Sequence, residues 1–171
     1  MNSEKLDQGF APILGENPTV LILGSMPGQA SLQAFQYYAH PRNAFWYIMG
    51  ELFGAHFEKP YQERVQKLRE NGIAVWDVIY QCARPGSLDS AIVEETVFVN
   101  DFEALFKNEP QIKKIIFNGA TAEKLYRRKV LSTLDSVVGQ SHQLIRLPST
   151  SPAHASVSRD EKFKIWAGAL G

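Results

Sequence analysis

Cysteine is nearly absent from this chain. Its 171 residues include one cysteine, Cys82, so a disulfide within the chain and an iron–sulfur cluster held by four cysteines are both excluded. The four histidines do not have the spacing typical of paired metal ligands, and the sequence predicts neither a metal nor any other cofactor. A single thiol suits a reducing compartment, so we expect a cytoplasmic protein.

A surplus of charge and a long apolar run are also missing. The 18 Lys and Arg residues balance the 18 Asp and Glu residues, so any contact with nucleic acid has to come from a local basic patch. The candidate cations are Arg42, Lys113, Lys114, Arg127, Arg128, Lys129, Arg159, Lys162 and Lys164. No apolar stretch approaches the roughly 18 residues of a membrane span, and residues 1–18 lack the pattern of a secretory signal. We therefore expect no membrane partner, and we expect a monomer.

The chain does contain short apolar runs that alternate with segments of helical periodicity. Strands are expected at Val20–Leu23, Ile73–Ile79, Lys114–Phe117 and Gln143–Leu147, and helices at Ala44–Phe53, Tyr61–Glu70, from Asn100 or Asp101 to about Pro110, from Thr121 to about Leu131, and from about Ser158 to Leu170. Residues 81–99 are expected to be irregular. The alternation predicts the α/β class, with one domain over residues 1–171 that has three α/β/α layers and a four-stranded, mainly parallel central sheet.

Two loops stand out in this arrangement. The segment Gly24-Ser25-Met26-Pro27-Gly28 follows the first strand and leads into Tyr37–Trp46, and the segment Leu147–His154 follows the last strand. In an open parallel sheet, the loops at the carboxyl ends of the strands form the ligand crevice. Both segments are rich in small, polar and aromatic residues, so they point to one shared site.

These segments resemble the uracil-DNA glycosylase superfamily, most closely its hypoxanthine-DNA glycosylase branch, near the mismatch-specific uracil-DNA glycosylases. Gly24–Gly28 matches the first motif of that superfamily, Ala39–Trp46 looks like its continuation, and Pro148-Ser149 begins a segment similar to the second motif. The likeness covers nearly the whole chain. It implies a DNA partner containing a deaminated base, hypoxanthine first, which the protein flips out and removes by hydrolysis. Neither motif contains a lysine that could form a Schiff base, which favours a monofunctional enzyme.

Asn43 is the candidate catalytic residue. In the resembling family, the asparagine at this place of the Pro-Arg-Asn segment is catalytic. Its amide can accept from one water and donate to another oxygen, but it cannot act as a strong base. Departure of the base through an oxocarbenium-like sugar therefore has to precede capture of water. The alternative is that Asn43 only caps the helix expected to begin at Ala44.

Candidate base-binding residues come from three loops or strand ends. The resemblance places Tyr38 where an aromatic ring stacks on the flipped base, with Tyr37 as a substitute. Asp77 lies where uracil-specific relatives keep an asparagine, and its carboxylate could accept from N1–H of hypoxanthine or N3–H of uracil. Gly24 would allow close approach, while the amides of Ser25 and Met26 could face the base or the water. Asn118 could also face the crevice, although a role in the turn before Gly119 is the alternative.

The remaining candidates would hold or wedge the DNA backbone. They are Pro27, Gly28, Ser149, Thr150, Ser151 and His154, because short hydroxyls and loop amides commonly bind phosphate oxygens. Uracil-specific relatives tend to have His or Asn directly before Pro-Ser, whereas this chain has Leu147, which argues against efficient uracil excision.

Three other functions stay open. One is a uracil-DNA glycosylase that acts on G:U mismatches or single strands, and another is a non-catalytic DNA- or nucleotide-binding module. An unrelated serine hydrolase is a weaker alternative, because Ser25 and Ser149 lack the G-x-S-x-G setting.

Overall fold

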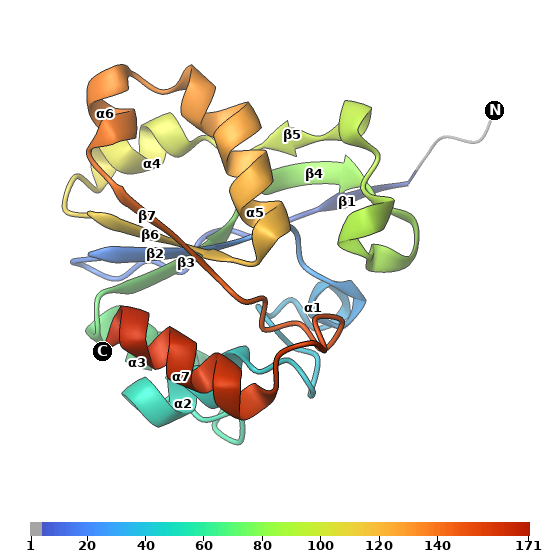
Figure 1. Ribbon diagram of the computed structural model, residues 1–171, viewed down its shortest axis with the longest axis vertical. Helices are drawn as coiled ribbons and strands as arrows, with labels where there is room; N and C mark the ends of the chain where they lie inside the picture. Colours follow the sequence, from blue (N-terminus) through green and yellow to red (C-terminus); the bar gives the residue numbers. More distant parts are fainter. Residues whose placement is uncertain (1–4) are drawn as a thin grey trace.

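The central element of the fold is a four-stranded parallel sheet, seen in a computed structural model that describes residues 5–171. Its strands are β2 (Val20–Gly24), β3 (Ile73–Asp77), β6 (Lys114–Asn118) and β7 (Gln143–Leu147), in the order β3-β2-β6-β7 (Figure 1). All neighbouring pairs are parallel. The expected central sheet is therefore confirmed, and the carboxyl ends of its strands lie along one edge.

Strand β2 shows why the sheet is covered on both faces. Leu21, Ile22 and Leu23 have no exposed surface, and successive side chains of a strand point to opposite faces. Leu21 and Leu23 belong to one apolar core and Ile22 to the other. A continuous apolar run is typical of a parallel strand buried on both faces, so the sequence pattern and the layered fold agree.

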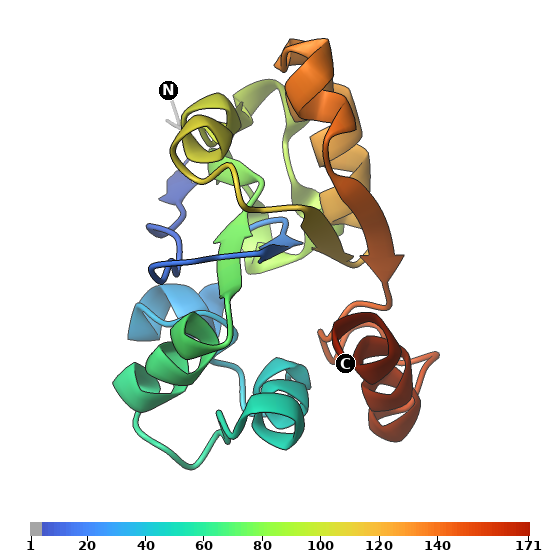
Figure 2. The ribbon, with the colours of Figure 1, turned by 90° about the vertical axis from the view of Figure 1, so that its left-hand side faces the viewer.

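Two helical layers enclose the sheet (Figure 2). Helices α2 (Phe45–Phe53), α3 (Tyr61–Glu70) and α7 (Arg159–Leu170) cover one face, and α4 (Phe102–Asn108), α5 (Ala120–Leu125) and α6 (Ser136–Gln140) cover the other. The chain continues from α5 through a π-helical turn at Tyr126–Val130, so the helix expected from Thr121 to Leu131 is present with an irregular end. Helices α6 and α1 (Gln29–Ala34) were not expected.

A second, smaller sheet corrects the expectation for residues 73–99. Strands β1 (Leu6–Gln8), β4 (Ile79–Ala83) and β5 (Phe98–Val99) form an antiparallel sheet in the order β1-β4-β5. The expected single strand Ile73–Ile79 thus ends at Asp77, and residues 81–99 are only partly irregular. The apolar run hid this break, because Val78 and Ile79 continue the pattern while the chain passes from one sheet to the other.

Side chains cap the starts of α4 and α7. The Asp101 carboxylate accepts from Ala104 N at 3.0 Å at the start of α4. The Ser158 hydroxyl accepts from Glu161 N at 3.2 Å at the start of α7. Both side chains satisfy amides that have no partner inside the first helical turn. Within residues 5–171, no helix is long and apolar enough to cross a membrane.

Candidate active site

A pocket of about 580 Å³ lies at the carboxyl ends of the central strands. Its volume falls in the range of small-molecule sites and leaves room for an extruded nucleoside. Every residue that the sequence singled out for the site lines it: Gly24, Ser25, Met26, Pro27, Gly28, Tyr38, Asn43, Asp77, Asn118, Ser149, Thr150, Ser151 and His154. The two loops thus form one site, as their positions after the first and last strands predicted.

Hydrogen-bond donors from the segment after β3 bind the carbonyls of the loop that follows β2. Gly24 O accepts from Val78 N at 2.9 Å, and Ser25 O accepts from Ile79 N at 3.1 Å. The next two carbonyls, those of Met26 and Pro27, accept from the guanidinium of Arg84. In a trans peptide, the following N–H points opposite to the carbonyl. The N–H groups of Ser25 and Met26 therefore point away from Val78 and Ile79, and a contact between these amides and a base or a water stays a prediction.

Asp77 ends β3 and sits directly opposite Gly24 in the register of the sheet. Its side chain is 4% exposed. Burial raises the pKa of Asp77 to about 7, and the charge of Arg84 opposes that rise. A carboxyl with a raised pKa keeps its proton at higher pH than an ordinary aspartate, and in that protonated form it can both donate and accept a hydrogen bond.

Gly24 allows Asp77 and Tyr38 to meet beside the backbone. A Cβ atom on Gly24 would lie 2.6 Å from Asp77 Oδ1 and 3.0 Å from Tyr38 Oη. Asp77 Oδ2 and Tyr38 Oη are both buried without a hydrogen-bond partner among the described residues. Buried polar atoms are normally paired, so two unpaired ones in a pocket mark the position of a ligand.

Tyr38 is held in an unusual backbone conformation, with φ at +54°. One face of its ring stacks on Phe45, with ring centroids 4.0 Å apart and an angle of 25° between the planes. Burial and the nearby Asp77 raise the pKa of Tyr38, so the hydroxyl stays protonated. Tyr37, the expected substitute, is anchored in the core: its hydroxyl donates to Ala11 O at 2.9 Å.

Asn43 is half-buried at the pocket wall just before α2. Its Oδ1 accepts from the N–H of Phe45, the first residue of α2, at 2.9 Å. The cap position itself is Ala44, so Asn43 lies one residue before the cap instead of at it as the sequence predicted, although its side chain still satisfies the first N–H of the helix. A second lone pair on Oδ1 and the Nδ2 donors remain for a ligand. The bond to Phe45 N fixes the amide plane, so capping and a catalytic role are compatible.

Asn118 ties the second loop to the sheet. Thr150 N donates to Asn118 Oδ1 at 2.8 Å, and Asn118 Nδ2 donates to Thr150 Oγ1 at 2.9 Å. Thr150 is 1% exposed, and its carbonyl accepts from Ala44 N, beside Asn43. The hydroxyl expected to bind phosphate is therefore engaged inside the protein. Asn118 acts as a structural link, which is close to the turn role that the sequence left open.

Arg84 and Asp89 are pocket residues that sequence reasoning missed. The Arg84 side chain is 1% exposed and lies 3.8 Å from Asp89, measured from Nη1 to Oδ1. The same carboxylate oxygen accepts from Ser25 Oγ at 2.7 Å, so the Ser25 hydroxyl donates to a carboxylate and not to the histidine base that activates a hydrolase serine. Both residues lie in the segment expected to be irregular, where only the Arg-Pro-Gly turn at 84–86 gave a signal.

Comparison with known proteins identifies the family. Residues 12–169 match the model of the uracil DNA glycosylase superfamily. The chain belongs to this superfamily. The expected family and the three-layer fold are thereby confirmed.

Three relatives of this superfamily member are informative. A hypoxanthine DNA glycosylase of Methanosarcina barkeri (strain Fusaro / DSM 804) is 41% identical over 113 residues, which are 66% of this chain and 70% of that protein. A hypoxanthine DNA glycosylase of Methanosarcina acetivorans is 34% identical over 161 residues, 92% of this chain and 94% of that protein. A solution NMR structure of a provisionally assigned uracil DNA glycosylase from Methanosarcina acetivorans matches with a TM-score of 0.77 at 33% identity, covering 97% of each chain.

Several of the basic residues that the sequence offered for contact with DNA are engaged within the glycosylase itself. Lys162 is 4% exposed, and its Nζ donates to Ser151 O at 3.1 Å, so it braces the second loop from within. Lys114 donates to Ala169 O and lies at the start of β6, at the far end of the strand from the pocket. Arg127 and Arg128 form ion pairs with acidic side chains.

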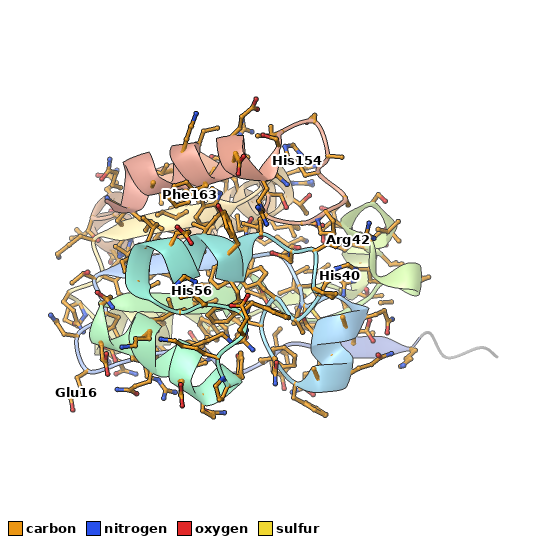
Figure 3. All side chains as sticks on the ribbon, turned by 90° about the horizontal axis from the view of Figure 1, so that it is seen from below. Glu16, His40, Arg42, His56, His154 and Phe163 are labelled. Atoms are coloured by element: carbon orange, nitrogen blue, oxygen red, sulfur yellow. The ribbon has the colours of Figure 1, made fainter. Side chains whose placement is uncertain are left out.

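Arg42, His40 and His154 lie at the pocket end of the molecule (Figure 3). Figure 3 shows Arg42 at the same end of the molecule as His40 and His154, opposite Glu16. Arg42 and His154 are exposed, and both histidines line the pocket. A contact between these groups and DNA stays a prediction.

Leu147 occupies the end of β7 as the sequence led us to expect. It is 5% exposed and belongs to the apolar core with Trp166 and Ile145. Its side chain therefore offers no hydrogen bond to a base in the glycosylase pocket. Among the described residues, no group of three His, Cys, Asp or Glu side chains could hold a metal ion.

Proposed function

We propose that this member of the superfamily is a monofunctional DNA glycosylase that excises hypoxanthine. The observation that carries the proposal is the buried carboxyl of Asp77, whose Oδ2 has no partner in the pocket among the described residues. The two Methanosarcina relatives described as hypoxanthine DNA glycosylases support the choice of base.

The lactam edge of hypoxanthine complements a neutral Asp77. This edge carries the N1–H donor beside the O6 acceptor, and a protonated carboxyl offers an acceptor beside a donor. Two parallel hydrogen bonds then hold the base. Guanine has the same edge, so discrimination against it also depends on extrusion. A mismatched base leaves the duplex at lower cost than one in an intact pair. Uracil carries an N3–H donor beside its O4 acceptor, so this pairing alone does not separate the two deaminated bases. The preference for hypoxanthine over uracil rests on the buried Leu147, whose side chain offers a departing uracil no donor.

The neutral carboxyl also assists departure of the base. When the bond between the sugar C1′ and N9 breaks, its electron pair goes to the base, and negative charge spreads toward O6. A donor placed there stabilises the departing base more than the bound nucleotide, which lowers the barrier. Ionised Asp77 would instead repel the departing base.

Water capture completes the hydrolysis. Asn43 holds the water through its amide without taking its proton, so the water adds to the sugar cation after the base has left. The proton that the added water then releases goes to the base anion, so the products are neutral hypoxanthine and an abasic sugar. Lysine does not occur among the described residues that line the pocket. The proposed reaction is therefore hydrolysis without a Schiff base or strand cleavage.

Variants of Asp77 test the proposal through release of free hypoxanthine from an inosine-containing duplex. Asp77→Asn keeps a donor and an acceptor on the same plane, so it should retain activity within about tenfold. Asp77→Ala removes both hydrogen bonds and should lose about a hundredfold or more, on the order of 3 kcal/mol. Equal losses in both variants would contradict recognition by a neutral carboxyl, and no base release by the unmodified protein would favour a binding module.

A further inference from the structure

Arg84 is a buried cation in the wall of the pocket. Its side chain is 1% exposed, and it lines the pocket. Its Nη1 donates to Met26 O at 3.4 Å, and its Nη2 donates to Pro27 O. Both partners are neutral carbonyls, so these bonds hold the guanidinium in place without cancelling its charge. Because little water screens it, such a cation acts strongly on an ionisable group nearby.

Asp89 is the counter-charge of Arg84. Its Oδ1 lies 3.8 Å from Arg84 Nη1 and accepts from Ser25 Oγ at 2.7 Å. The bond to Ser25 ties the carboxylate to the loop that begins at Gly24. The Asp89 side chain is 45% exposed, and water weakens the field of an exposed charge. Asp89 therefore offsets only part of the charge of Arg84.

Asp77 lies within reach of both charges. The three side chains line one pocket. Burial is the largest cause of the raised pKa of Asp77, while Arg84 lowers that pKa and Asp89 raises it. The other ionisable groups near Asp77, among the residues that the structure describes, are the hydroxyls of Tyr37 and Tyr38. Burial raises the pKa of both hydroxyls, so they stay uncharged.

We infer that Arg84 and Asp89 are positioning residues whose opposed charges decide the pH at which base excision fails, an inference that rests on the proposed function. In the proposed reaction, hypoxanthine pairs with protonated Asp77. A positive charge nearby favours the ionised carboxylate and lowers the upper pH limit of excision, whereas a negative charge raises that limit. Arg84 has the first effect and Asp89 the second.

A purely structural role for the pair predicts a different result. Arg84 and Asp89 both bind the loop that carries Ser25, Met26 and Pro27. If they only held this loop, their variants would lose rate equally at every pH. The pH midpoint of the fall in rate would then stay where it is in the unmodified protein. The midpoint therefore separates an effect of charge from an effect of shape.

The experiment measures this midpoint in single-turnover release of hypoxanthine from an inosine-containing duplex. Arg84→Gln removes the charge but keeps a donor, and its midpoint should rise by about one pH unit. Asp89→Asn keeps an acceptor for Ser25, and its midpoint should fall by about half a pH unit. Arg84→Lys keeps the charge but lacks the planar fork that binds both carbonyls, so its rate should fall while its midpoint stays within about 0.3 pH unit.

The ion pair between Arg128 and Glu94 is the matched control. About half of each side chain is exposed, and neither residue lines the pocket. Solvent screens such charges, so Arg128→Gln and Glu94→Gln should leave the midpoint unchanged. A thermal melt of each variant checks the fold. If Arg84→Gln does not fold, the downward shift in Asp89→Asn decides the inference.

The inference is overturned if the midpoints of Arg84→Gln and Asp89→Asn move in the same direction or not at all, or if the control variants move as far. A second measurement needs no turnover: the NMR signal of the Asp77 carboxyl carbon, assigned through Asp77→Asn, should titrate with the same opposed shifts. Absence of those shifts would also overturn it. Failure of the proposed function is distinguishable, because the unmodified protein would then release no hypoxanthine, while the carboxyl titration still tests the pair.

Discussion

Replacing Gly24 with alanine should disable the pocket while leaving the fold largely intact. The new Cβ would lie 2.6 Å from Asp77 Oδ1, whereas ordinary contact begins at 3.4 Å, so the carboxyl oxygen would have to retreat by about 0.8 Å. Tyr38 Oη, at 3.0 Å, would be displaced less. A shift of about 1 Å in a reacting or recognising group can cost a hundredfold in rate. We therefore expect roughly a hundredfold slower excision of hypoxanthine.

The cost to stability should be smaller. Gly24 lies in β2 and is not among the glycines with positive φ, so alanine can adopt its backbone conformation. Overpacking of this kind costs about 1–3 kcal/mol, and each kcal/mol lowers Tm by about 2–4 °C in a chain of this size. Gly168→Ala is the matched control, because a Cβ there meets no atom within 4 Å.

The assay pairs a single-turnover rate on inosine-containing duplex with a thermal melt of the same preparation. The reasoning is refuted if Gly24→Ala excises hypoxanthine at a normal rate, since the Asp77–Tyr38 pair would then have no part in holding the base. It is also refuted if Gly168→Ala loses as much activity as Gly24→Ala.

Three further predictions concern the same pocket. Asn43→Ala should lower the chemical rate a hundredfold or more and cost about 1 kcal/mol of stability through the lost bond to Phe45 N; an early melt with normal cleavage would contradict the catalytic role. Tyr38→Ala should weaken binding of inosine-containing DNA in an Asn43→Ala background, whereas Tyr38→Phe should be mild; equal losses would refute stacking by the ring. The excision rate should fall as pH rises through about 7, because Asp77 loses its proton there, and Asp77→Asn should abolish that fall. The raised pKa of Asp77 also affects the free energy of unfolding. Between about pH 4 and about pH 7 the unfolded state has released this proton while the folded state keeps it, so stability declines by at most about 1.4 kcal/mol per pH unit. Urea titrations across that pH range measure the decline.

The sequence predicted the sheet and the location of the site because both depend on local patterns. Runs such as Val20–Leu23, bounded by proline and glycine, can be recognised as buried strands without any tertiary information. Loops that follow such strands are brought together by the parallel topology alone. For that reason the residues of both motifs were expected to share a pocket before their contacts were known.

The parts that were missed depend on contacts between distant residues. Arg84 is 58 positions from Met26, whose carbonyl it binds, and Asn118 is 32 positions from Thr150. From the sequence, Lys162 was expected to be a surface cation. In the structure its ammonium group binds the Ser151 carbonyl, 11 positions away, and no local pattern indicates that contact. The break after Asp77 was hidden because both sheets require apolar residues. Local patterns therefore give the position of the site, whereas tertiary contacts decide which side chains stay free to act.

The base preference of the enzyme tests the central claim most directly. Matched duplexes that contain hypoxanthine, uracil or xanthine at one position are incubated with the protein under single-turnover conditions. Alkali then cleaves the strand at each abasic site that base excision has left. Because the Leu147 side chain offers no donor to a departing uracil, we expect the hypoxanthine duplex to be processed fastest. Faster processing of the uracil duplex would contradict the account and assign the pocket to uracil.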